Sequence, residues 1–420
     1  MVWRASPGGI GVEPFSTTGI WSYRESTEPS WGGTLEFDPV TGCTLSVFRP
    51  LEDLEADTER PQVIHGIVEA RIAGGPCVRL PDPHRLSQTI QSAGLIVDVF
   101  RIGDAIFGPA PLPANATFEQ VRPRFARFGD WFSTTGFEFA SGARRATSGE
   151  FSTTWRQPDD TVASIALGDV SLGVTLSHRV RHRHAVFDES PHIVFDLRRP
   201  CGLNELERTV VQPLEYFLSL ALDGDAGIDG VEVVLAAQVT SPSLRWFVLP
   251  ESAGRRTRRR RTARDGLFDL SDVRDSLTDV LSHWFATVAA HRRALDIFFA
   301  RVREAPPFVE LDFSALYHAA VAFAWAPGVE DHDALAALFA RLPASIGSDL
   351  LDRATFPREL VALHRRIWLE DAETFDHAVL DAVAKLESAF KAVLLAEIGV
   401  EPALSRLRWE APGFRPRRRS

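Results

Sequence analysis

The sequence predicts an α+β protein, in which a β-rich N-terminal domain is followed by an all-helical C-terminal bundle. Up to about residue 200, short runs of alternating apolar and polar residues are separated by Gly and Pro, which is typical of antiparallel strands. From residue 308 onward, apolar residues recur at helical spacing instead. An arginine-rich, low-complexity run at 251–266 lies between the two patterns.

A hairpin near the N-terminus gives the clearest strand signal. Leu35 and Phe37 alternate with polar residues, DPVTG at 38–42 is typical of a turn, and Leu45 and Val47 resume the alternation. Similar patterns predict further strands within residues 68–80, 95–107, 149–156 and 162–186.

Residues 203–222 interrupt the strands with helical spacing. Pro213 is expected either to kink this helix or to begin its second part. The following DGDAGIDG, residues 223–230, is rich in aspartate and could be compared with a calcium loop. Ile228 and Val234 stand where an EF-hand loop requires Gly and Glu, so a solvated turn without metal is predicted.

The second half of the chain predicts five helices. The first begins at an N-cap, Ser271 or Asp272, and runs to about Glu304, where APP at 305–307 ends it. Four more are predicted at 313–325, 333–342, 356–368 and 373–398, with Gly399 capping the last. The short connections favour antiparallel packing in a bundle.

These patterns predict four segments. They are a β-rich domain at 1–250, an arginine-rich loop with a connecting helix at 251–307, a helical bundle at 308–408 and a basic tail at 409–420.

Composition narrows the class of protein. The net charge of −10 argues against a general nucleic-acid binder, and only two of the 46 basic residues are lysines, as expected of a GC-rich genome. No apolar run approaches the roughly 20 residues of a membrane span, and no signal peptide is recognised. The three cysteines show neither disulfide nor zinc spacing. A cytoplasmic protein without membrane contact, metal or cofactor is therefore expected.

PRELVALHRR, residues 357–366, contains the candidate catalytic residues Arg358 and His364. Six positions on an ideal helix place their side chains about 120° apart, and Pro357 suits a first helical turn, where free backbone N–H groups would also favour phosphate. An Arg and a His on a helix edge beside HRR are also explained by a solvated basic face. From these residues alone, the solvated face is favoured over a catalytic pair.

Other basic residues are weaker candidates for RNA contact. Arg365 and Arg366 follow His364 directly, and Arg258, Arg259 and Arg260 lie in the 251–266 run, which is also explained as a mobile surface loop.

SHRVRHRHAVF, residues 177–187, is the remaining basic cluster. As a single strand it would place Arg179, Arg181 and Arg183 on one face, and His178, His182 and His184 on the other. His182 and His184 have chelating spacing, yet no Cys or acidic partner is fixed nearby. An exposed polar strand is therefore favoured over phosphate or RNA contact, and over a metal site.

Several segments in the same order resemble the ApeA-like proteins of bacterial anti-phage defence, which carry a C-terminal HEPN domain. They are GIWSYRESTEPSWGGTLEFDPVTGCTL at 19–45, LEYFLSLALDGDAGIDGVEV at 214–233, LFDLSDVRDSLTDVLSHWF at 267–285, and the Arg358–His364 spacing. Two features depart from the family pattern. Glu359 replaces the usual polar residue after the arginine, and ALYHAAVAFAW at 315–325 lacks the usual acidic residue.

The resemblance implies a metal-independent endoribonuclease that acts in abortive infection. In such enzymes the ribose 2′-hydroxyl attacks the adjacent phosphate, so His364 would transfer a proton and Arg358 would stabilise the developing charge. The implied partners are RNA, with tRNA one candidate, a second copy that completes a composite cleft, and a phage-derived trigger. A catalytically degenerate HEPN binding or dimerisation module, with the β-domain as sensor, is the main alternative. A carbohydrate-binding β-protein with a helical dimerisation tail is the third.

Overall fold

The computed structural model contains two compact units. The first comprises residues 1–126, 134–207 and 228–255, and the second comprises residues 127–133, 208–227 and 256–420. The residues that the structure describes are 15–23, 31–38, 42–50, 68–72, 77–80, 84–91, 95–109, 112, 115–139, 153–181, 184–236, 244–248, 266–304, 306–346, 351–369, 376–401 and 407.

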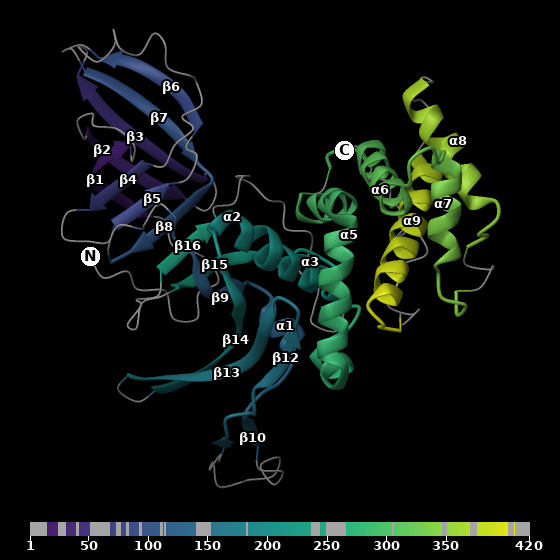
Figure 1. Ribbon diagram of the computed structural model, residues 1–420, viewed down its shortest axis with the longest axis horizontal. Coiled ribbons are helices and arrows are strands. Elements are labelled where there is room, and N and C mark those ends of the chain that lie inside the picture. The colour runs from purple at the N-terminus through teal and green to yellow at the C-terminus, as the bar shows by residue number, and fades with distance from the viewer. Residues whose placement is uncertain are drawn as a thin grey trace, which may run out of the picture. The chain divides into compact units, whose positions relative to one another are not determined.

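The first unit is built on one antiparallel sheet of 14 strands (Figure 1). Their order across the sheet is β12-β13-β14-β9-β15-β16-β8-β5-β4-β1-β2-β3-β7-β6, and a small second sheet pairs β10 with β11. The strands are β1 Phe15–Tyr23, β2 Trp31–Asp38, β3 Gly42–Pro50, β4 Val68–Ile72, β5 Cys77–Leu80, β6 His84–Gln91, β7 Leu95–Ile102, β8 Asp104–Gly108, β9 Phe118–Phe125, β10 Phe137–Phe139, β11 Thr153–Trp155, β12 Thr161–Ile165, β13 Gly168–Arg181, β14 His184–Cys201, β15 Ile228–Leu235 and β16 Leu244–Val248.

The predicted N-terminal hairpin is confirmed as β2 and β3. Leu35 lies opposite Leu45 in the antiparallel register, and both are fully buried. Phe37 and Val47 share their face, as the alternation predicted, while Glu36 points to solvent. Burying one face of each strand fixes this register, because a slip of one residue would expose the whole apolar set.

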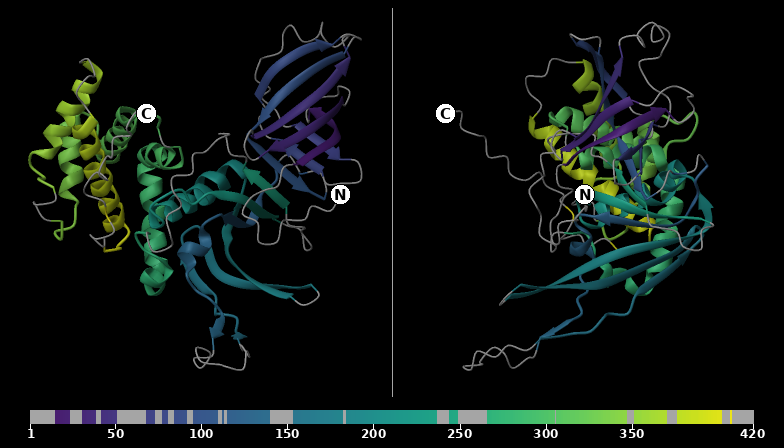
Figure 2. Two further views of the ribbon diagram at one scale, coloured as in Figure 1. Left: turned by 180° about the vertical axis from the view of Figure 1, so that it is seen from behind. Right: turned by 90° about the vertical axis from the view of Figure 1, so that its left-hand side faces the viewer.

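The basic stretch 177–187 does not form one strand, contrary to the prediction. It is the tip of a long hairpin of β13 and β14, in which Arg181 pairs with His184 (Figure 2). His178 pairs with Phe187 across the hairpin and stacks on it, with ring centroids 6.3 Å apart. The shared histidine face of the prediction therefore does not form, and His182 lies outside the described residues.

The predicted helix at 203–222 forms in two parts. α2, Leu203–Leu206, continues through a π-helical turn, Glu207–Val211, into α3, Gln212–Ala221. Pro213 lies in the first turn of α3, where its missing N–H costs no hydrogen bond, so it begins the second part. The turn predicted at 223–230 follows, but it is shorter and it is not solvated. Asp223, at φ 50°, is buried, and residues 228–230 already belong to β15.

The second unit is helical. Its elements are α1 Phe128–Phe132, α3, α4 Leu270–Val273, a 3₁₀ turn Arg274–Ser276, α5 Leu277–Arg303, α6 Val309–Ala324, α7 Asp331–Ala340, α8 Phe356–Leu369 and α9 Asp376–Glu397. Together with the strands of the first unit, these helices confirm the predicted α+β class. None of the helices in the described part of the chain is long and apolar enough to span a membrane.

Two helix boundaries correct the prediction. The N-cap is Asp269, whose side chain accepts a hydrogen bond from the Ser271 backbone, while Asp272 completes the capping box. The capped helix is the short α4, and the long helix begins only at Leu277. Gly399 follows α9 with φ 76°, as expected of a C-terminal glycine.

α3 packs on α5 within the second unit. Trp284 of α5 is fully buried and donates its indole N–H to the Pro213 carbonyl at 2.7 Å. Tyr216 stacks on Phe299 with ring centroids 4.4 Å apart. The segment between β14 and β15 therefore supplies part of the helical core.

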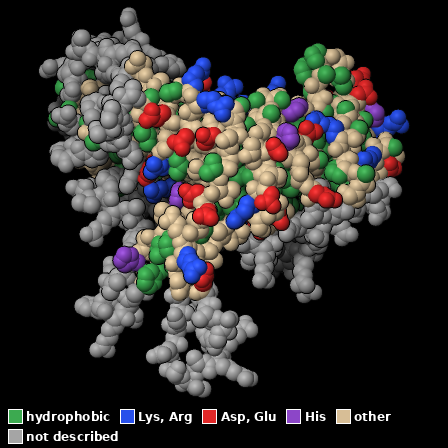
Figure 3. Space-filling view, turned by 60° about the horizontal axis from the view of Figure 1, so that its bottom comes forward, with side chains coloured by type: hydrophobic (Ala, Val, Ile, Leu, Met, Phe, Trp, Pro, Cys, Tyr) green, Lys and Arg blue, Asp and Glu red, His purple; other side chains and the backbone are tan. Residues whose placement is uncertain are grey.

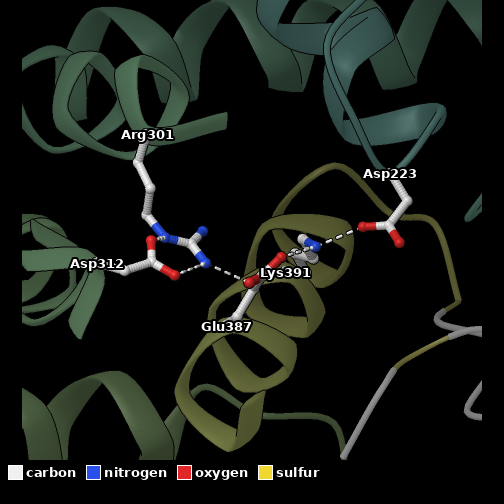
Figure 4. Close-up of polar contacts among 5 residues, drawn as sticks. All are labelled: Asp223, Arg301, Asp312, Glu387 and Lys391. Carbon is white, nitrogen blue, oxygen red and sulfur yellow. Dashed lines mark hydrogen bonds and ion pairs between the residues drawn. The ribbon is translucent and has the colours of Figure 1, made fainter. Parts of the chain in front are cut away.

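A buried charge network also joins this segment to α9 (Figure 4). Lys391 donates hydrogen bonds to Asp223 and to Glu387, and Arg301 donates to Glu387 and to Asp312. Lys391 and Arg301 are 9% and 3% exposed, so each cation needs these carboxylates to offset its lost hydration.

Candidate active site

The N-terminus of α8 is closed by local hydrogen bonds. The Asp352 side chain accepts from the Ala354 N–H and the Thr355 hydroxyl, and its carbonyl accepts from the Phe356 N–H. The N–H groups of Arg358 and Glu359 both donate to the Thr355 carbonyl. Because these amides already have partners, the predicted free N–H groups for phosphate are not present here, although Pro357 does lie in the first turn, as expected.

α8 presents two different faces. Leu360 and Leu363 are buried against the bundle, whereas Arg358 is exposed and His364 is half-buried. This follows from the helical repeat, which places His364 about 120° from Arg358 and closer to the apolar side. Among the described residues, no hydrogen bond or ion pair holds the Arg358 guanidinium, so its fork is open to an incoming anion.

His364 lies among aromatic rings of α6. Its imidazole stacks on Tyr317 with ring centroids 4.1 Å apart and ring planes 5° apart. His318, the next residue, lies at 5.1 Å and nearly perpendicular. Phe313 lies farther away, at 6.4 Å. These contacts fix the orientation of the His364 ring.

An acidic residue enters the same cluster from α7. The Tyr317 hydroxyl donates to the Asp331 carboxylate at 2.7 Å. The sequence 315–325 lacks an acid, as noted above, but Asp331 begins the next helix and reaches the same rings. No sequence pattern points to Tyr317, His318 and Asp331, because only the packing of α6, α7 and α8 brings them to His364.

The surroundings of His364 favour its neutral form. Burial lowers its pKa most, the neighbouring His318 lowers it further, and the Asp331 charge acts in the opposite direction. Its Nε2 atom is buried without a hydrogen-bond partner. Since the ring as a whole is half-buried, solvent reaches a part of it other than Nε2, and proton transfer to a ligand would use Nδ1.

Of the other candidate arginines, Arg365 lies near enough to act on this cluster through its charge. Arg365 is exposed, and its charge partly offsets the burial that raises the pKa of Tyr317. Arg366 instead lines a pocket of about 350 Å³ between α8 and α9, together with Glu359 and Lys385. Arg258, Arg259 and Arg260 lie outside the described residues.

Figure 3 shows acidic and basic side chains interspersed on the face that it presents, so this face supplies little long-range attraction for an anion. In the part of the chain that the structure describes, no group of three or more His, Cys, Asp or Glu is arranged to hold a metal ion.

The fold and the cluster define an α+β protein with a candidate active site on its C-terminal helices. The family model for ApeA N-terminal domain 1 matches residues 16–284, more than half of the chain. The chain therefore belongs to the ApeA N-terminal domain 1 family, which confirms the ApeA-like resemblance and supports an anti-phage defence protein. The match ends before α6, so it does not cover Arg358 or His364. No curated protein and no solved structure matches the chain.

Proposed function

We propose that this protein is an anti-phage effector whose C-terminal helices form a HEPN endoribonuclease. The main support is the environment of His364, an imidazole that burial keeps neutral and that Tyr317 holds in place. A neutral imidazole can accept the proton of a ribose 2′-hydroxyl. Arg358, on the same helix and open to solvent, would bind the phosphate and stabilise its charge in the transition state. The substrate is RNA, with tRNA as a candidate.

The proposed site works as a dimer and without a metal. Arg358 and His364 point about 120° apart on α8, so two copies related by a twofold axis would bring an arginine of one chain to a histidine of the other. We place the HEPN module at residues 308–408 and assign its activation to a phage-derived trigger acting on the β-rich part of the chain.

The test is cleavage of total RNA by the purified protein in EDTA. Wild type should produce fragments with cyclic phosphate ends, and the Arg358→Ala, His364→Ala double variant should not. A matched control is Arg293→Ala with His283→Ala, because both are exposed residues of α5. Cleavage that requires added Mg²⁺ or Mn²⁺ would refute the mechanism.

A degenerate HEPN module that binds or dimerises without cutting is the second candidate. It is favoured by Glu359, an exposed acid next to Arg358 that opposes phosphate binding, and by the buried Nε2 of His364. This function predicts phage protection that survives loss of both Arg358 and His364. Glu359→Asn separates the two candidates further, because only a nuclease would gain turnover from it.

A further inference from the structure

The proposed reaction requires two proton transfers at one phosphodiester. A base removes the proton from the 2′-hydroxyl while the 2′-oxygen bonds to phosphorus. The bond from phosphorus to the 5′-oxygen breaks, and an acid must donate a proton to that oxygen. In an in-line displacement the entering 2′-oxygen and the leaving 5′-oxygen lie on opposite sides of phosphorus, so a second group beside His364 is needed to serve both at once. Arginine cannot be that acid, because it keeps its proton.

A second imidazole lies beside His364. His318 is exposed on α6, and its ring is 5.1 Å from the His364 ring, at 85° to it. Among the described residues no hydrogen bond or ion pair restrains its nitrogens; its ring contacts are to Tyr317, at 5.6 Å, and to His364. Two rings at this separation can both reach the oxygens of one phosphate group lying beside them.

We propose that His318 is a second catalytic residue, which donates the proton to the leaving 5′-oxygen while His364 accepts the proton of the 2′-hydroxyl. This inference rests on the proposed nuclease function and deepens it. The assignment follows burial, since the half-buried His364 is suited to start the reaction neutral and the exposed His318 can carry a positive charge in water. After the step, His364 holds the proton of the 2′-hydroxyl and His318 has lost one, and exchange with water restores both.

The closeness of the two imidazoles also helps to explain the lowered pKa of His364. The positive charge of His318 and that of His364 repel one another, which contributes to the lowered pKa of His364. Asp331 and Arg365 are the other charged groups acting on the Tyr317–His364 stack, with opposite signs. The lowered pKa of His364 favours the neutral base that the first proton transfer requires.

The experiment compares two RNA substrates that differ at the leaving atom. In the second, sulfur replaces the 5′-bridging oxygen of one linkage, and a thiolate leaves without a proton because thiols ionise at about pH 8.5. His318→Ala should lower kcat on the oxygen substrate by about 10²–10⁴-fold. Most of that loss should disappear on the sulfur substrate, whereas the loss in His364→Ala should remain on both.

Two controls keep the result interpretable. His283→Ala removes an exposed histidine of α5 and should leave both rates unchanged. His318→Gln retains the size of the side chain and checks that packing is intact, with near-wild-type unfolding and a similar KM. Equal losses on both substrates, or full activity of His318→Ala beside inactive His364→Ala, would overturn the inference while the nuclease function stands. Wild-type protein that shows no cleavage dependent on Arg358 and His364 would instead overturn the proposed function, and this inference with it.

Discussion

At the scale of single residues, His364 is the position where burial and charge decide chemistry. Its neighbours act in opposite directions on one property, the pKa of the imidazole. Burial and His318 lower it, and Asp331 raises it. A lowered pKa means that the base stays neutral, and therefore active, to a lower pH than an ordinary histidine with a pKa near 6.5. The acidic limb of the activity profile should accordingly lie below that value.

Removing the Asp331 charge should move this limb further. Asp331→Asn abolishes the effect that raises the pKa of His364, so the pKa should fall and the acidic limb of kcat/KM should shift to lower pH. The side-chain amide can still accept the hydrogen bond of Tyr317. The measurement is kcat/KM as a function of pH, from about pH 4.5 to about pH 8, because an imidazole changes charge between about pH 5 and pH 8.

Asp333→Asn provides the control for this shift. Asp333 is an exposed carboxylate of the same helix, and its contact is with His332 at 3.1 Å. Its loss should leave the limb in place. A limb that moves to higher pH in Asp331→Asn, or that moves equally in both variants, would contradict the assignment of His364 as the base.

At the scale of elements, one partly exposed stripe of α8 combines the groups that a single-stranded RNA requires. Val361 and His364 are half-buried, and Arg365 and Trp368 are exposed; Trp368 lies four residues after His364 and three after Arg365. Trp368 is 60% exposed, which is unusual for so large an aromatic side chain. An indole next to a basic residue suits stacking on a nucleobase, which contributes about 1–3 kcal/mol per base.

Trp368→Ala should therefore weaken binding of RNA without impairing proton transfer. We expect KM to rise by about tenfold or more, at an unchanged kcat, because stacking on a neighbouring base acts equally on ground state and transition state. Phe308→Ala is the matched control, since Phe308 is 64% exposed and caps the start of α6. A fall in kcat with constant KM would show that Trp368 serves the local fold or the dimer instead.

Element boundaries also show how far the sequence determines this molecule. Periodicity located α8 almost to the residue, because a single apolar face controls it. For Pro213 the sequence left a kink and a helix start open, and the structure selects the helix start. The break between β13, which ends at Arg181, and β14, which begins at His184, was missed, since the alternation of Arg and His continues through 181–184. His318 and Asp331 were missed for another reason. Asp331 is 33 positions and His318 is 46 positions before His364 in the sequence, so helix packing brings them together and no local sequence pattern predicts it.

At the scale of the whole molecule, the two lysines of this arginine-rich chain serve different purposes. Lys391 is buried between Asp223 and Glu387, so it links the segment after α3 to α9. Lys385 forms a surface pair with Asp381 at 2.8 Å and is about a third exposed. Burial opposes the charge of Glu387, but Arg301 and Lys391 outweigh it and hold the pKa of Glu387 well below its ordinary value.

Lys391→Met should therefore destabilise the helical unit at neutral pH by about 3–5 kcal/mol, because Asp223 and Glu387 both lose the Lys391 charge and Glu387 keeps only Arg301. The lowered pKa of Glu387 contributes stability that is present above its unfolded pKa and is lost as pH falls through the folded pKa. The gap between wild type and variant should thus narrow in acid. Lys385→Met should cost only about 0–1 kcal/mol. Urea unfolding at several pH values measures both, and equal costs would contradict the role of the network.

The proposed function requires a dimer in which each site takes Arg358 from one chain and His364 from the other. Mixing two inactive variants tests this requirement. Arg358→Ala and His364→Ala variants each lack one group in every site. If a site takes its arginine from one chain and its histidine from the other, a heterodimer contains one complete site and one that lacks both groups. Equal mixing makes about half of the dimers heterodimers, so about a quarter of wild-type activity should return.

Two controls are needed before the activity of the mixture is interpreted, one for dimer formation and one for subunit exchange. Sedimentation should show dimers for wild type and both variants at micromolar concentration, and subunit exchange should be complete before the assay. Dimers that exchange without regaining activity would place Arg358 and His364 of the same chain in each site, and the long Arg358 side chain would then have to reach back along α8 to His364. A monomer that cleaves RNA would refute the composite cleft altogether. Recovery near one quarter would instead mean that association completes the active site, so that control of dimer formation could control the nuclease.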